Sequence, residues 1–212
     1  MKKHLKKITA LLLVVIMVFS FAACGSKTGP DDIVAKVNDV EIKRGQVEGF
    51  TSIYTYMMGY EPSDLSAEQF EVILQDYVNV EIVRQYFDSK ETSVYPDSYD
   101  ESVAAFIESA HTDGAEFLEK YSVTDEHLSD FFSAQYVTNA ILAEIMEEHP
   151  EEELKPKAEA YYEENPDYFK DTETGELLPI DDYLESIYYM FYQELYAEKV
   201  EEIQKDMTVE IM

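Results

Sequence analysis

The chain has 212 residues, of which 16 are basic and 45 acidic, so its net charge is −29, and 46% of its residues are hydrophobic. A field this negative repels phosphate backbones and anionic lipid headgroups, which argues against nucleic acid as a partner. The hydrophobic fraction argues against a wholly disordered chain. The acidity is explained at least as well by solubility alone as by a ligand.

The first 23 residues have the layout of a targeting signal. Lysines 2, 3, 6 and 7 precede the apolar run ITALLLVVIMVFSFAA, which ends in small residues. This run is short for a membrane span, which needs roughly 20 apolar residues. A basic start, an apolar middle and a small-residue end predict a signal peptide that is removed, here residues 1–23.

Cys24, the only cysteine, comes directly after this segment. Phe21, Ala22, Ala23 and Cys24 resemble the bacterial lipoprotein signal, although leucine is more usual at the first place. The resemblance implies cleavage before Cys24 and a lipid on its sulfur, with residues 24–32 as a polar lipidated linker. An ordinary secretory peptide that ends near a free cysteine is the alternative. Removing the signal leaves 12 basic against 45 acidic residues, a net charge of −33.

Residues 33–212 form the body, a length that fits one domain or two small interleaved ones. Ile33, Ala35 and Val37 alternate with other residues, Asn38-Asp39 follows, and Val40 and Ile42 resume the alternation. Asn and Asp tolerate the left-handed conformations of tight turns, so this pattern predicts a β-hairpin.

Helical periodicity follows the hairpin. A first helix is predicted over 46–62, ending near Gly59, and a capping box of Ser66 and Gln69 begins a second. Further helices are predicted over 102–110, 115–121, 124–149, 153–165 and 180–206. In the second helix, one face collects the apolar residues Phe70, Ile73, Leu74, Tyr77, Val80 and Val83.

The last six residues, MTVEIM, alternate at Val209 and Ile211 and predict a strand. Because an isolated hairpin is marginally stable in water, residues 207–212 are expected to pair with the hairpin. The predicted fold is therefore mainly α, with a small sheet made by an N-terminal β-hairpin and a C-terminal strand.

Four stretches in this order resemble the SurA-like extracytoplasmic foldases, including the PrsA lipoproteins: VAKVNDVEIKRGQVE, YSVTDEHLSDFF, AYYEENPDYF and EKVEEIQKDMTVEIM. The resemblance covers nearly the whole mature chain and implies that 33–212 is a SurA-like helical chaperone domain. The family hairpin usually reads Val-Asn-Gly, whereas Asp39 replaces the glycine here.

One departure from that family concerns catalysis. Members with prolyl isomerase activity carry a parvulin domain after the position of Phe169, where this chain has only KDTETGELLP before its last helix. An independent domain needs about 50 residues or more. The resemblance therefore implies a chaperone body without the isomerase, and the chain is not expected to be an enzyme.

No other motif predicts a catalytic, phosphate-binding or metal-binding site. His111, His127 and His149 lack the spacing of a zinc site, and the sequence has neither a phosphate-binding glycine loop nor a Gly-x-Ser-x-Gly elbow. The stretch DTETGE places its glycine wrongly for a calcium loop. No metal and no cofactor are predicted.

An aromatic run in the last helix has the most functional potential. Six consecutive apolar residues, 187–192, cover more than one helix face, so the helix is either packed on both sides or partly open as a groove. Tyrosine and methionine suit a groove for unfolded clients. The candidate client-binding residues are Tyr54, Met57, Met58, Tyr188, Tyr189, Phe191 and Tyr192.

These observations predict a membrane-anchored, extracytoplasmic chaperone-like lipoprotein that binds unfolded or newly secreted polypeptides without ATP or catalysis. Its partners would be those polypeptides and, through the lipid on Cys24, the cell membrane. The alternative is an adaptor or assembly lipoprotein for one specific envelope partner.

Overall fold

The computed structural model describes residues 29–62, 66–90, 93–172 and 174–212, so the predicted signal peptide and Cys24 lie outside the described residues. The described part is mainly helical with a small antiparallel sheet, which confirms the predicted fold class. Its elements are β1 (Ile33–Val37), β2 (Val40–Lys43), α2 (Arg44–Met57), α3 (Ala67–Ser89), α4 (Tyr99–Asp113), α5 (Ala115–Lys120), α6 (Asp125–Glu148), α7 (Glu151–Glu164), η1 (Pro166–Tyr168), η2 (Ile180–Asp182), α8 (Leu184–Gln204) and β3 (Val209–Ile211).

The described chain divides into two compact units. The sheet unit comprises residues 29–148 together with Leu195–Met212, and the α7 unit comprises His149–Glu194. Each unit is described by itself below. Helix α8 contributes its first half to the α7 unit and its second half to the sheet unit.

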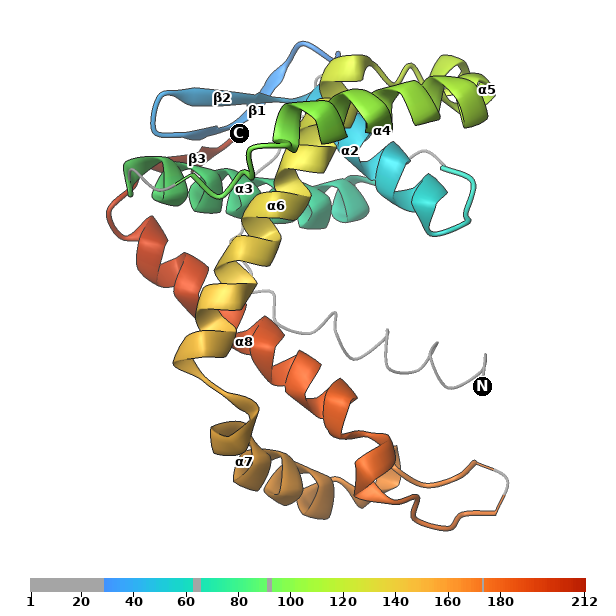
Figure 1. Ribbon diagram of the computed structural model, residues 1–212, viewed down its shortest axis with the longest axis vertical. Coiled ribbons are helices and arrows are strands. Elements are labelled where there is room, and N and C mark those ends of the chain that lie inside the picture. Colours follow the sequence, from blue (N-terminus) through green and yellow to red (C-terminus); the bar gives the residue numbers. More distant parts are fainter. Residues whose placement is uncertain (1–28, 63–65, 91–92, 173) are drawn as a thin grey trace. The chain divides into compact units, whose positions relative to one another are not determined.

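The sheet joins the two ends of the described chain. Its strand order is β2-β1-β3, and both neighbours run antiparallel to β1 (Figure 1). Ala35 pairs with Ile42 on one side and with Ile211 on the other. Ala35 and Val37 have no exposed surface, since the central strand is covered by its partners and by α3. The predicted pairing of the C-terminal strand with the hairpin is confirmed.

The hairpin turn is formed by the two residues that the sequence indicated. Asn38 has φ = 53°, in the left-handed region, and Asp39 does not have a positive φ. Asparagine tolerates this conformation better than most residues, because its short polar side chain can bond locally. The glycine that Asp39 replaces is therefore not needed at this turn.

Helix α3 is the centre of the sheet unit. The Ser66 and Gln69 capping box begins it as predicted, with Gln69 N donating to Ser66 Oγ at 3.2 Å. The predicted single apolar face was too narrow, because Val78 and Ile82 are also fully buried. A helix that is apolar on several sides lies inside a fold, and α3 contacts β1, α2 and α6.

Side-chain caps, a proline and a 3-10 turn mark the ends of α6 and α8. Thr124 and His127 form a reciprocal cap at the start of α6, and α6 ends at Glu148, before Pro150. Helix α8 begins at Leu184 rather than at residue 180, since residues 180–182 form a separate 3-10 turn.

An apolar cluster lies where α2, α5 and α6 meet in the sheet unit. It consists of Ile53, Phe117, Leu118, Val123, Leu128 and Phe131. In the described ranges, no helix combines the length and apolarity that crossing a membrane requires.

Candidate functional site

The candidate client-binding residues fall into two groups with different surroundings. The first group, Tyr54, Met57 and Met58, lies at the end of α2 in the sheet unit. Their exposed fractions are 53%, 62% and 58%. Positions i, i+3 and i+4 share one helix face. These three residues therefore form a continuous exposed apolar strip, called the α2 stripe below.

The stripe continues the buried face of α2 toward the end of the helix. Val47 and Ile53 are buried, and the Phe50 ring contacts the rings of Tyr77 and Phe131 at centroid distances of 5.6 and 5.1 Å. This packing fixes which face of α2 points inward. Tyr54 and Met57 follow Phe50 by four and seven residues on the same face, where α2 is exposed.

Helix α5 supports the end of α2. The Tyr56 ring stacks on the Phe117 ring with a centroid distance of 4.1 Å and an interplanar angle of 16°. Beyond the helix, Glu61 accepts hydrogen bonds from Lys120 Nζ at 2.7 Å and from the Tyr121 hydroxyl at 2.6 Å. These bonds lower the pKa of Glu61 and hold the connection after α2 against α5.

The second group, on α8, is mostly core of the α7 unit. Tyr188, Phe191 and Tyr192 are buried, whereas Tyr189 is 56% exposed. The ring of Phe191 meets Tyr161 edge-on at 6.1 Å, and the Tyr192 hydroxyl donates to the His149 carbonyl at 3.1 Å. A client could reach these three buried side chains only by opening the α7 unit.

The two groups thus belong to different units, and only the α2 stripe is a contiguous exposed surface. The aromatic run of α8 has the packed arrangement that the sequence left open as one of two possibilities. Tyr189 is the residue of that run that remains accessible.

A polar network inside the sheet unit was not predicted. Glu81 is only 5% exposed, and both Glu81 and Asp130 form salt bridges with Arg84. Arg84 Nη2 lies 2.8 Å from Asp130 Oδ1, and the Tyr77 hydroxyl donates to the other Asp130 oxygen. Burial and the Asp130 charge raise the pKa of Tyr77, which stays protonated.

The network continues to the sheet through Gln85. Its Nε2 donates to Glu81 Oε1 at 2.8 Å and to the Val37 carbonyl at 3.0 Å. Because these carboxylates are held by fixed donors, their role is to anchor α3 to α6 and to β1. The signal in the sequence was a set of hydrogen-bonding residues at helical spacing, 77, 81, 84 and 85, which alternate with apolar residues of α3.

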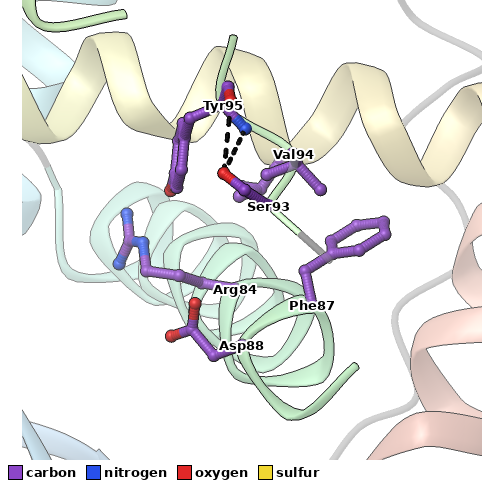
Figure 2. A pocket seen from close by; sticks show the side chains of 7 residues that line it. Arg84, Phe87, Asp88, Ser93, Val94 and Tyr95 are labelled. Carbon is purple, nitrogen blue, oxygen red and sulfur yellow. Dashed lines mark hydrogen bonds between the residues drawn. The ribbon is translucent and has the colours of Figure 1, made fainter. Parts of the chain in front are cut away.

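A small pocket lies beside this network, at the end of α3 (Figure 2). Its volume is about 170 Å³, below the 300 Å³ typical of ligand sites. Arg84 is committed to its two carboxylates, and Ser93 Oγ bonds the backbone of Tyr95. The pocket is lined by Arg84, Phe87, Asp88, Ser93, Val94, Tyr95 and Val137. Its fixed polar groups and small size do not favour a catalytic role.

The three histidines of the body serve separate local roles. His111 Nε2 lies 2.7 Å from Asp125 Oδ1 at the surface, His127 caps α6, and the His149 carbonyl accepts from Tyr192. Within the described ranges, no three His, Cys, Asp or Glu side chains are grouped so that they could hold a metal ion.

Asp171 and Thr174 of the stretch DTETGE lie in a turn. Asp171 Oδ1 accepts from the backbone N–H and the hydroxyl of Thr174, and Gly175 has φ = 71°. The turn connects the bridged residues Lys170 and Leu177.

No family model, curated protein or solved structure matches this chain.

Proposed function

We propose that this protein is an extracytoplasmic, lipid-anchored chaperone that binds apolar segments of unfolded or newly secreted polypeptides without ATP or catalysis. The α2 stripe is the observation that carries the proposal. The sequence resemblance to SurA-like foldases and PrsA lipoproteins supports it, and so does a sheet that joins the two ends of the body.

The stripe has the chemistry that such binding requires. Contiguous exposed apolar patches on soluble proteins are commonly interaction sites. Methionine adapts its shape to different partners, and tyrosine adds apolar area with a hydroxyl that remains solvated. Tyr54, Met57 and Met58 supply both kinds of side chain on one helix face, and the preceding turns of the helix are packed in the core.

The acidic body complements this role. A mature net charge of −33 makes complexes with aggregation-prone clients repel one another in solution. The lipid on Cys24 would hold the body at the outer face of the cell membrane. Two acyl chains supply a stable anchor where one alone is marginal.

The test is suppression of aggregation. Residues 24–212 with Cys24→Ser contain every element described above and cannot be lipidated at that position. This mature chain is added at near-stoichiometric ratios to several unrelated unfolded proteins, and light scattering is followed. We expect slower aggregation of each client. If none is slowed, the proposal is wrong.

A pair of variants locates the activity. Tyr54→Ser with Met57→Gln and Met58→Gln removes the α2 stripe, and we expect most of the suppression to be lost. The matched control replaces one tyrosine, one leucine and one methionine of similar exposure elsewhere: Tyr168→Ser, Leu177→Gln and Met146→Gln, residues that are 58%, 50% and 47% exposed. Equal loss in both variants would mean that the stripe is not the site.

The same variants separate the chaperone from an adaptor lipoprotein with one partner. An adaptor would leave unrelated clients unprotected, and it would retain a single envelope protein in a pull-down that the stripe variant loses. A chaperone gives the opposite pattern.

A further inference from the structure

We propose that the α2 stripe selects cationic apolar segments, that is, stretches in which hydrophobic residues are interspersed with lysine or arginine. This inference rests on the proposed chaperone function and specifies its substrate class. It follows from the charges of the elements that adjoin the stripe.

The chain around the stripe carries charge of one sign. Residues 45–83, which include α2 from its second residue and most of α3, contain no lysine, arginine or histidine. The same stretch has seven acidic residues: Glu48, Glu61, Asp64, Glu68, Glu71, Asp76 and Glu81. A client segment that docks at the end of α2 therefore meets no cation from this stretch.

The neighbouring helix α5 extends this acidic setting. Glu116 and Glu119 are exposed on α5, whose Phe117 stacks on Tyr56 next to the stripe. Lys120 is the one basic residue of α5, and its ammonium lies 2.7 Å from Glu61. The ion pair neutralises this cation locally, so the remaining exposed carboxylates set the sign of the potential.

Helix α3 follows α2 in the chain (Figure 1), and its Phe70 ring lies 3.9 Å from the guanidinium of Arg44, the first residue of α2. Glu68 and Glu71 are exposed there. Cationic side chains of a client would find the exposed carboxylates of α5 beside the stripe, while the client's apolar residues cover the stripe. Tyr54 adds a ring face suited to a cation–π contact with lysine or arginine.

The attraction between a cationic client and these carboxylates depends on the salt concentration. The screening length is about 10 Å at 0.1 M salt, so carboxylates on the adjoining helix contribute at low ionic strength and little at high ionic strength. Several exposed pairs of modest strength together amount to an affinity gain of about tenfold. The apolar part of the affinity should survive high salt.

The experiment measures the binding of three unstructured, fluorescein-labelled peptides to the mature chain by anisotropy. The peptides share their apolar residues and differ only in being lysine-rich, uncharged or glutamate-rich. We expect the lysine-rich peptide to bind about tenfold more tightly than the uncharged one at about 0.05 M salt, with the advantage largely lost at about 0.5 M. The glutamate-rich peptide should bind most weakly.

Two charge-reversal pairs distinguish a local effect from the field of the whole molecule. Glu116→Lys with Glu119→Lys changes carboxylates on α5 beside the stripe, whereas Glu159→Lys with Glu163→Lys changes exposed carboxylates on α7. Both pairs alter the net charge equally. We expect only the first pair to remove the preference for the lysine-rich peptide.

The outcomes separate this inference from the proposed function. Equal binding of all three peptides, or equal effects of both reversal pairs, would overturn the charge selection and leave the chaperone proposal standing. If no peptide binds and no client is protected from aggregation, both the charge selection and the proposed chaperone function are wrong.

Discussion

Asn38 and Thr208 are 170 residues apart in the chain and bind each other through two hydrogen bonds. Asn38 N donates to the Thr208 carbonyl at 2.7 Å, and Thr208 N donates to Asn38 Oδ1 at 2.9 Å. The Asn38 amide group also donates to Gln85 Oε1 at 2.7 Å. One turn residue thus connects the hairpin, the C-terminal strand and α3.

This arrangement predicts graded effects of substitution at Asn38. Asn38→Gly keeps the left-handed backbone but loses the side-chain bonds, which should lower the free energy of unfolding by about 1 kcal/mol. Asn38→Ala should cost about 1 kcal/mol more, because its Cβ disfavours φ = 53°. Urea unfolding measures both values. Asp39→Ala is the control and should have a small effect, and equal losses for Gly and Ala would contradict the argument about backbone conformation.

The buried ion network predicts a larger effect. Arg84→Met leaves Glu81 and Asp130 without their cation in a largely desolvated site, and removing one partner of such a network costs about 3–5 kcal/mol. Lys36→Met, which breaks the exposed pair with Glu41, should lower the free energy of unfolding far less. Urea unfolding of the two variants side by side makes the comparison. Similar losses would mean that the Arg84 network is not specially buried.

The two predictions show what the sequence could and could not reveal. Alternation at the chain ends indicated the sheet, because a hairpin alone is marginal and only the C-terminal residues repeat its period. The Arg84 network was missed, since polar residues in a helix are usually on its surface, and only their three-dimensional neighbours show that Glu81 is buried.

The candidate binding residues illustrate the same limit. Tyr54, Met57 and Met58 are exposed, whereas Tyr188 and Phe191 were proposed on similar grounds and are buried. An aromatic helix gives the same periodicity whether a neighbour covers it or a client does. The burial of Phe191 depends on α7, because Tyr161 and Lys157 of that helix lie against its ring.

Position 49 of α2 is packed so closely that a side chain larger than that of Gly49 is expected to lower the stability of the fold. A Cβ at this position would lie 2.5 Å from the His127 ring, so the ring would have to move. Alanine favours a helix over glycine by about 1 kcal/mol, but crowding a packed site costs about 1–3 kcal/mol. Gly49→Ala should therefore lower the free energy of unfolding.

A double-mutant cycle checks the cause of that loss. In the His127→Ala background the clash is absent, so Gly49→Ala should become neutral or stabilising, as measured by urea unfolding. If Gly49→Ala is equally harmful with and without the His127 ring, the loss has another origin.

His127 also predicts a pH dependence of stability. Burial lowers its pKa below the ordinary value of about 6.5, although Glu126 and Asp130 act in the opposite direction. The Thr124 backbone N–H donates to the neutral His127 Nδ1 at 3.3 Å, and protonation of this nitrogen would remove the acceptor. The unfolded chain therefore takes up a proton at a higher pH than the folded one, so the contribution of His127 to stability is present above pH 6.5 and is lost as the pH falls below it. The measurement compares the protein with His127→Gln, whose side chain supplies an oxygen acceptor at the same capping position and does not titrate. Between about pH 7.5 and pH 5.5, the free energy of unfolding should decrease less for this variant than for the unchanged protein. An identical decrease in both proteins would show that carboxylates alone set the pH response.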